Sequence, residues 1–223
     1  DWPLFRQQYA LLLDTPSQDL RCYSYSARLQ AGDSKVLAEA RDTLWMTAKD
    51  LPSACNAILD SLQASSALTD ADRWARLRLA LLANAQGLAR HLAGQLGRTV
   101  SASDLQALVA NPAKYLDKVS TDSRLDRELA VFALVRLART DVDGAAARLE
   151  RLQLRLGDEP SAAAWQQLGL VASRKLDSRA LEWMAKSDGR TGWTDEAIES
   201  RLRMALRAEN WELVLRSIRQ LSD

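Results

Sequence analysis

Residues 69–97 decide the fold class, and they read TDADRWARLRLALLANAQGLARHLAGQLG. The run from Thr69 to Asp72 is a capping sequence, because hydroxyl and carboxylate oxygens accept hydrogen bonds from the free N–H groups of a first helical turn. Leucines then recur along one helix until small and polar residues interrupt it. A second, short helix follows over 87–96 and ends at Gly97, a residue type suited to the position after a helix. The stretch therefore predicts a helical hairpin.

The same pattern of helix, short break and helix continues along the chain, giving about fourteen short helices separated by breaks of roughly two to six residues. The composition agrees, because 39 Leu and 36 Ala stand against 9 Val and 3 Ile, and β-branched residues favour strands. We expect an all-α fold, a right-handed superhelix of short antiparallel helical hairpins of the α-solenoid kind. No shift in composition marks a boundary, so we expect a single domain over residues 1–223.

The composition argues against several functional classes. Thirty basic and 29 acidic residues nearly cancel, whereas nucleic-acid binders are usually clearly basic. No apolar run is long enough to span a membrane. One His and two Cys speak against a Cys/His zinc cluster and a Ser-His-Asp triad, and no Gly-rich phosphate loop is present. The chain begins with Asp1 rather than Met, and we expect both ends to be cut from a longer protein.

Acidic pairs are where acid–base chemistry would be sought. They are Asp70/Asp72, Asp141/Asp143 and Glu196/Glu199. Most of these residues stand in breaks or first turns, where a carboxylate caps N–H groups and complements the helix dipole, so capping is the favoured interpretation. His91 has no nucleophile near it in the sequence, and we expect it to be a packing or surface residue.

Seven Trp in a chain with only two Phe could line a surface that binds sugar or peptide, although Trp at helical spacing beside Leu usually packs between hairpins. Trp193, next to the Gly-rich stretch 187–192, is the best candidate for exposure. Arg201, Arg203 and Arg207 could form a basic strip on one helix, with a solvated, ion-paired face as the alternative. These four residues are our candidate contacts for glycan or peptide.

Cys22 and Cys55 are the only cysteines. An even count without neighbouring metal-ligand residues fits one disulfide, which would imply an oxidising compartment. Two buried free thiols fit the count equally well. The number of cysteines leaves both alternatives open.

A more specific signal lies in Leu-Trp-Met-Thr-Ala-Lys at 44–49 and Pro-Ser-Ala-Cys at 52–55, with Cys-Tyr-Ser-Tyr-Ser-Ala upstream at 22–27. Together these segments resemble the N-terminal superhelical region of the soluble lytic murein transglycosylases. That family carries a Cys followed by Tyr-rich residues and then Leu-Trp-x-Thr-x-Lys-x-x-Pro-x-Ala-Cys. The resemblance continues, in order, through residues 92–95, 111–112 and 198–206.

The resemblance implies a curved stack of short helices that closes into a ring in the complete enzyme. It also implies a disulfide between Cys22 and Cys55 and a periplasmic location. The parent enzyme would cleave the β-1,4 bond between N-acetylmuramic acid and N-acetylglucosamine, leaving a 1,6-anhydro end, without metal or cofactor.

The catalytic residue of the family does not carry over. It is a Glu in a Glu-Ser motif of a lysozyme-like C-terminal domain. Glu199-Ser200 lies instead in the segment that matches the superhelix, without the Gly-Leu-Met-Gln-like and Ala-Tyr-Asn-like motifs expected around a catalytic Glu. We therefore interpret Glu199 as a surface helix residue and assign no catalytic residue to this chain.

The leading hypothesis is a non-catalytic superhelical segment that holds the C-terminal catalytic domain of its parent and weakly contacts peptidoglycan glycan strands or stem peptides. Trp and Tyr would stack on sugar faces, and Arg would bind stem-peptide carboxylates. The alternative is a helical-repeat adaptor for protein partners with no cell-wall role, which reduced cysteines would favour. A third hypothesis is that this chain is catalytic by itself. The absence of a catalytic group of His or carboxylate residues in the sequence argues against it.

Overall fold

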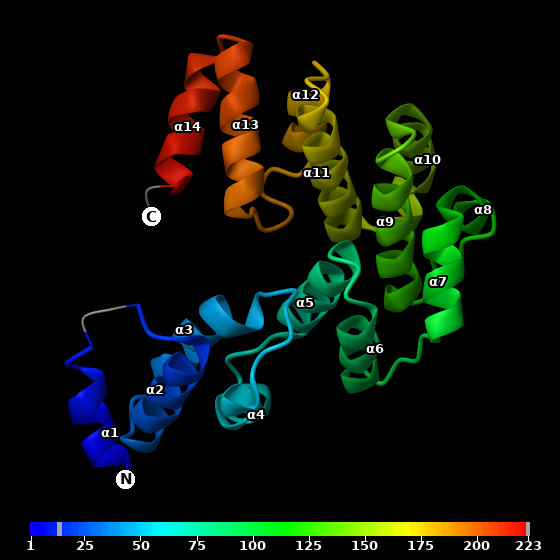
Figure 1. Ribbon diagram of the computed structural model, residues 1–223. Coiled ribbons are helices and arrows are strands. Elements are labelled where there is room, and N and C mark those ends of the chain that lie inside the picture. The colour runs from blue at the N-terminus through cyan, green and yellow to red at the C-terminus, as the bar shows by residue number, and fades with distance from the viewer. Residues whose placement is uncertain (13–14, 222–223) are drawn as a thin grey trace. The chain divides into compact units, whose positions relative to one another are not determined.

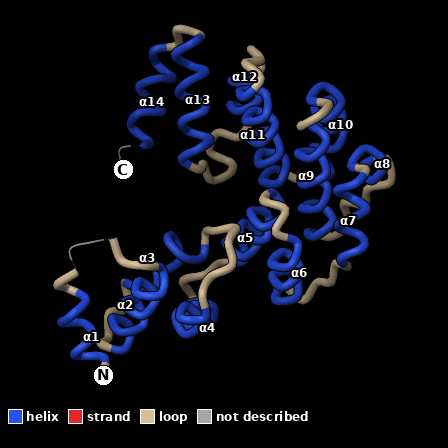
Figure 2. The backbone as a smooth tube through the Cα atoms, viewed as in Figure 1, coloured by secondary structure: helices blue, strands red, loops and turns tan. Residues whose placement is uncertain are grey.

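The computed structural model describes residues 1–12 and 15–221, and within them every regular element is a helix (Figures 1 and 2). The all-α prediction is therefore confirmed. The chain divides into two compact units, residues 1–100 and 101–223. The single domain over residues 1–223, the right-handed winding of the hairpins and their place in a ring stay predictions.

The first unit contains six α-helices and two short helical turns within the described residues. They are α1 (Trp2–Tyr9), α2 (Gln18–Gln30), α3 (Val36–Ala40), the π-helical turn η1 (Arg41–Trp45), the 3-10 turn η2 (Ser53–Cys55), α4 (Asn56–Ala64), α5 (Asp70–Leu82) and α6 (Gln86–Gln95). Helix α1 packs on α2, α3 on α4, and α5 on α6. The short connection between α5 and α6 makes them the antiparallel hairpin that residues 69–97 predict.

The core of the first unit gathers around Trp45, the largest side chain among its fully buried residues. The turn η1 carries Leu44 and Trp45 inward, and Ile58, Leu62 and Leu77 from α4 and α5 are also buried. The Trp45 indole Nε1 donates to the main-chain oxygen of Asp72, 3.1 Å away. A buried indole N–H needs such a partner, and this bond fastens η1 to the first turn of α5.

The second unit contains the remaining helices. They are α7 (Ala102–Ala110), α8 (Pro112–Leu116), α9 (Arg124–Ala138), α10 (Val142–Leu156), α11 (Asp158–Arg174), α12 (Ala180–Ala185), α13 (Asp195–Arg207) and α14 (Trp211–Leu221). Helix α11 is its centre, since it packs against α9, α10, α12 and α13, while α14 packs on α13 (Figure 1).

The predicted caps are largely confirmed. Thr69 and Asp72 exchange hydrogen bonds in a capping box at the start of α5, and the Asp141 carboxylate accepts from the Gly144 N–H at the start of α10. Proline in a first helical turn is favoured, and a start at Pro52 or Pro160 would fit that preference. Pro52 instead lies before the turn η2, and α11 begins at Asp158, two residues ahead of Pro160.

Cys22 of α2 and Cys55 of η2 form a disulfide, 33 residues apart in sequence. The pairing implied by the resemblance is therefore present, and the alternative of two free thiols is not. A closed loop of this size restricts the unfolded chain, which stabilises the folded state.

We predict that replacing both Cys22 and Cys55 by Ser lowers the free energy of unfolding by about 3–4 kcal/mol, from the entropy of the opened loop. Urea denaturation followed by circular dichroism measures the change. A reductant should destabilise the wild-type protein and leave the double variant unaffected. Equal stability of the two proteins without reductant would contradict the prediction.

Replacement by alanine should have opposite effects on stability at two glycines that lie within helices. A Cβ on Gly169 of α11 would lie 2.5 Å from Met184 Cγ, whereas a Cβ on Gly94 of α6 would meet nothing within 4 Å. Gly169→Ala should therefore destabilise the protein by about 1–3 kcal/mol through overpacking, and Gly94→Ala should stabilise it by up to about 1 kcal/mol. Thermal melts of both variants test this, and a stabilising Gly169→Ala would contradict the described packing of α11 on α12.

Candidate binding surface

Arg201 of α13 lies inside the second unit. Its side chain is 2% exposed, and its guanidinium stacks 4.1 Å from the centre of the Trp193 ring. The Nε donates to Ser217 Oγ at 3.0 Å, one terminal nitrogen pairs with Asp188 at 3.4 Å, and the other donates to Gln220. Burial lowers the pKa of Arg201, and the negative charge of Asp188 acts in the opposite direction. Arg201 therefore joins α13 to α14 and to the loop after α12.

The predicted basic strip is corrected by this geometry. Arg203 and Arg207 are exposed, and Arg203 pairs with Glu199 at 3.3 Å, but Arg201 points into the protein because it has several buried partners there. Trp193 is half-buried against the cluster of Leu170, Met184 and Ala197, with Arg201 over its ring. Trp193 is therefore not a freely exposed stacking platform, and Arg203 and Arg207 remain the accessible pair.

The carboxylates of the candidate acidic pairs cap helices or form ion pairs. Asp70 pairs with Arg73, Asp143 with Arg179 and Glu196 with Arg174. His91 is exposed on α6, with its ring nitrogen 3.1 Å from the Gln95 side chain. In the part of the chain that the structure describes, no three His, Cys, Asp or Glu side chains are grouped as a metal site.

A groove of the first unit was missed by sequence reasoning. By this groove we mean two neighbouring pockets, one of about 530 Å³ and one of about 280 Å³, that share Gln63, Leu92 and Gln95 in their walls. The larger pocket is also lined by Trp45, Asp70, Arg73, Trp74, Leu96 and Arg98. The smaller pocket is also lined by Asp50, Leu51, Asn56, Leu59, Asp60, Arg76, Leu88 and His91. Tryptophan, arginine, carboxylate and amide groups together suit a sugar or peptide ligand.

Arg76 of α5 is the unusual member of this groove. Its side chain is 5% exposed, its guanidinium lies 4.4 Å from the centre of the Trp45 ring, and it lines the smaller pocket. No described residue accepts a hydrogen bond from its buried Nε. Burial lowers the pKa of Arg76, while the charge of Asp50 acts to raise it. A buried cation with an unused donor is costly unless something compensates it.

One sequence signal could have indicated this groove. Arg76 and Arg78 alternate with leucines in the segment after Trp74. So many leucines around them indicate that this part of the helix is buried on most sides, which is unusual for arginine. Sequence reasoning treated arginine as a surface residue, and the stacking of Arg76 on Trp45 depends on a contact between η1 and α5 that no local pattern contains.

No helix in the described parts of the chain combines the length and the apolar character that crossing a membrane requires.

No protein-family profile matches the chain. A soluble lytic murein transglycosylase of Escherichia coli (strain K12) is 31% identical to it over 204 residues, which cover 84% of the chain and 30% of that relative. A protein of the same name from Salmonella typhimurium (strain LT2) is 28% identical over 203 residues, with the same two shares of 84% and 30%. The chain thus spans about a third of the length of the curated relatives it matches.

The structural comparison agrees. The lytic transglycosylase Slt of Pseudomonas aeruginosa, solved as an inactive mutant, matches with a TM-score of 0.58 and 25% sequence identity, covering 98% of the chain and 38% of that structure. The fold thus defines the class, an assembly of packed helical hairpins. Within this class the chain resembles the soluble lytic murein transglycosylases, and the resemblance carried by residues 22–27 and 44–55 is confirmed.

The geometry around Arg201 predicts a contrast between two arginines of α13. Arg201→Met should lower the free energy of unfolding by about 2–4 kcal/mol, because Ser217 and Asp188 lose a buried partner. Arg203→Met removes an exposed ion pair and should cost less than about 0.5 kcal/mol. Urea denaturation of both variants measures the difference. Equal, small losses would show that the buried network of Arg201 does not stabilise the fold.

Proposed function

We propose that this chain is a non-catalytic scaffold domain of a periplasmic lytic transglycosylase. In the complete protein it holds the C-terminal catalytic domain and presents a surface to peptidoglycan glycan strands or stem peptides. The parent enzyme cleaves the β-1,4 bond between N-acetylmuramic acid and N-acetylglucosamine and leaves 1,6-anhydromuropeptides. The observation that carries the proposal is the sequence similarity to soluble lytic murein transglycosylases over 84% of the chain.

Two features of the chain support the location and the scaffold role. The Cys22–Cys55 disulfide suits an oxidising compartment such as the periplasm. The carboxylate Glu199, in the one Glu-Ser pair that resembles the family's catalytic motif, is exposed and pairs with Arg203. An exposed carboxylate in an ion pair with arginine is the arrangement of a surface helix residue.

Contact with peptidoglycan would use two surfaces. Arg203 and Arg207 are exposed one helical turn apart on α13 and suit the carboxylates of stem peptides. The groove of the first unit offers the partly exposed Trp74 in its wall beside Arg73 and the amide side chains of Gln63 and Gln95. Aromatic rings bind the apolar faces of sugars, so this groove suits a glycan or its peptide branch.

We predict that the protein co-sediments with purified peptidoglycan sacculi and releases no anhydromuropeptides from them. The Arg203→Ala/Arg207→Ala double variant should bind several-fold more weakly at low salt, and the difference should shrink as salt screens the charges. The matched control is Arg151→Ala/Arg155→Ala, two exposed arginines with the same spacing on α10. Folded protein that stays in the supernatant would overturn the peptidoglycan role and favour a helical adaptor for protein partners, whereas product release would overturn the non-catalytic assignment.

A further inference from the structure

The smaller pocket of the first unit contains a cation without a complete set of partners. Arg76 forms part of its wall from α5 and is 5% exposed, and its Nε–H has no acceptor among the described residues. The Trp45 ring, 4.4 Å from the guanidinium carbon, supplies part of the stabilisation that a buried cation needs. It cannot accept the in-plane hydrogen bonds that a guanidinium donates. The pocket wall therefore contains a buried cation whose hydrogen-bonding capacity the described residues do not fully use.

Two exposed carboxylates line the same pocket. Asp50, before η2, and Asp60, on α4, both line it and are exposed, and Asp50 is close enough for its charge to favour the charged form of Arg76. Neither forms a salt bridge with Arg76 in the structure, while other arginines such as Arg73 and Arg124 do pair with acids. The pocket thus keeps positive and negative groups apart across a volume of about 280 Å³.

Further hydrogen-bonding side chains complete the lining. Asn56 and Gln63 of α4 face the pocket together with His91 and Gln95 of α6, and Leu88 and Leu92 provide an apolar surface. Amide groups can donate to a carboxylate and accept from an ammonium or a peptide N–H. This mixture suits a small polar ligand that carries both charges, and the two aspartates disfavour a doubly charged anion such as phosphate.

We propose that this pocket binds a peptide residue that carries both a free carboxylate and a free ammonium group, with the carboxylate on Arg76 and the ammonium group between Asp50 and Asp60. The proposal rests on the proposed function, and the ligand is then such a residue of a peptidoglycan stem peptide. The planar guanidinium matches a carboxylate better than an ammonium side chain would, because it offers two parallel N–H donors. The peptide backbone then extends along the shared wall of Gln63 and Gln95 toward the larger pocket, which holds Trp74 and Arg73.

The first test uses the unaltered protein and changes only the ligand. Stem peptide released from sacculi by an amidase is titrated by calorimetry in three forms, unmodified, with its carboxylates amidated, and with its amino group acetylated. We expect the unmodified peptide to bind and each modification to weaken binding by about ten-fold or more, as for the loss of a charged hydrogen bond. Equal affinity of all three forms overturns the proposal. A loss on amidation alone retains the role of Arg76 and overturns that of the aspartates.

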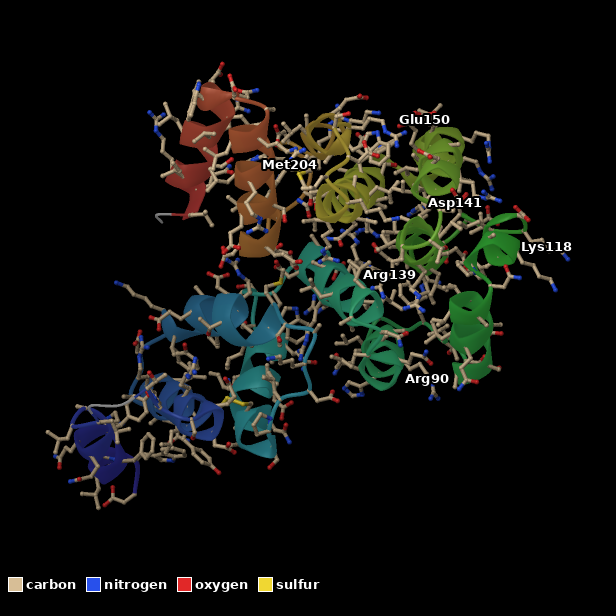
Figure 3. All side chains as sticks on the ribbon, turned by 45° about the horizontal axis from the view of Figure 1, so that its top comes forward. Arg90, Lys118, Arg139, Asp141, Glu150 and Met204 are labelled. Atoms are coloured by element: carbon tan, nitrogen blue, oxygen red, sulfur yellow. A yellow bond between two sulfur atoms is a disulfide. The ribbon has the colours of Figure 1, made fainter. Side chains whose placement is uncertain are left out.

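The second test changes the pocket. Arg76→Lys keeps the charge but removes the planar fork, and it should weaken binding of the unmodified peptide by about ten-fold. The matched control is Arg90→Gln, since Arg90 is exposed on the side of α6 away from α4 and lines neither pocket (Figure 3). It should bind as the wild type does. Circular dichroism checks that both variants fold, and a folded Arg76→Lys with unchanged affinity overturns the proposal.

The sacculus and peptide experiments separate this proposal from the proposed function. Sacculus binding without stem-peptide binding overturns the pocket assignment and leaves the cell-wall role in place. Stem-peptide binding that depends on Arg76, without sacculus binding, supports the pocket and overturns the scaffold role at peptidoglycan. A rise in melting temperature with unmodified peptide, absent for the amidated form, is a further expected result because the ligand binds only the folded state.

Discussion

Most helices of this protein are too short to persist alone, and this constraint governs the rest of the structure. Forming a first helical turn costs more conformational entropy than its hydrogen bonds return, so a helix needs either length or a partner. Helix α11 has 17 residues and α3 has 5, and both depend on burial against neighbours. Helix α11 is buried against four surrounding helices. Helix α3 continues directly into the turn η1 and packs on α4.

Where apolar burial is limited, the first unit uses specific links. The disulfide joins α2 to η2, and the Trp45 indole joins η1 to α5. The links enclose the segment from Trp45 to Cys55, which has little regular structure of its own and contributes Asp50 and Leu51 to the smaller pocket. The stretch that carries the resemblance to the transglycosylases is therefore also the stretch that forms part of the groove wall.

Two buried arginines show how the same side chain can serve different ends. Arg201 is stacked on Trp193 and bonded to Ser217 and Asp188, so its charge and donors are used within the protein. Arg76 is stacked on Trp45 but keeps an unused Nε–H beside a pocket. Burial alone does not distinguish the two residues. The difference lies in whether the surrounding residues supply acceptors, and those described around Arg76 leave its Nε–H without one.

The amino-acid sequence by itself determined the helical class, the hairpin at residues 69–97 and most helix starts, because these depend on propensity, spacing and caps within a few residues. The resemblance over residues 22–55 also identified the disulfide. Only the tertiary structure decided that Arg201 is internal, that Trp193 is covered by it, and that Arg76 meets Trp45 across η1 and α5. These outcomes depend on contacts between residues distant in sequence, and a solvated arginine and a buried one have the same local pattern.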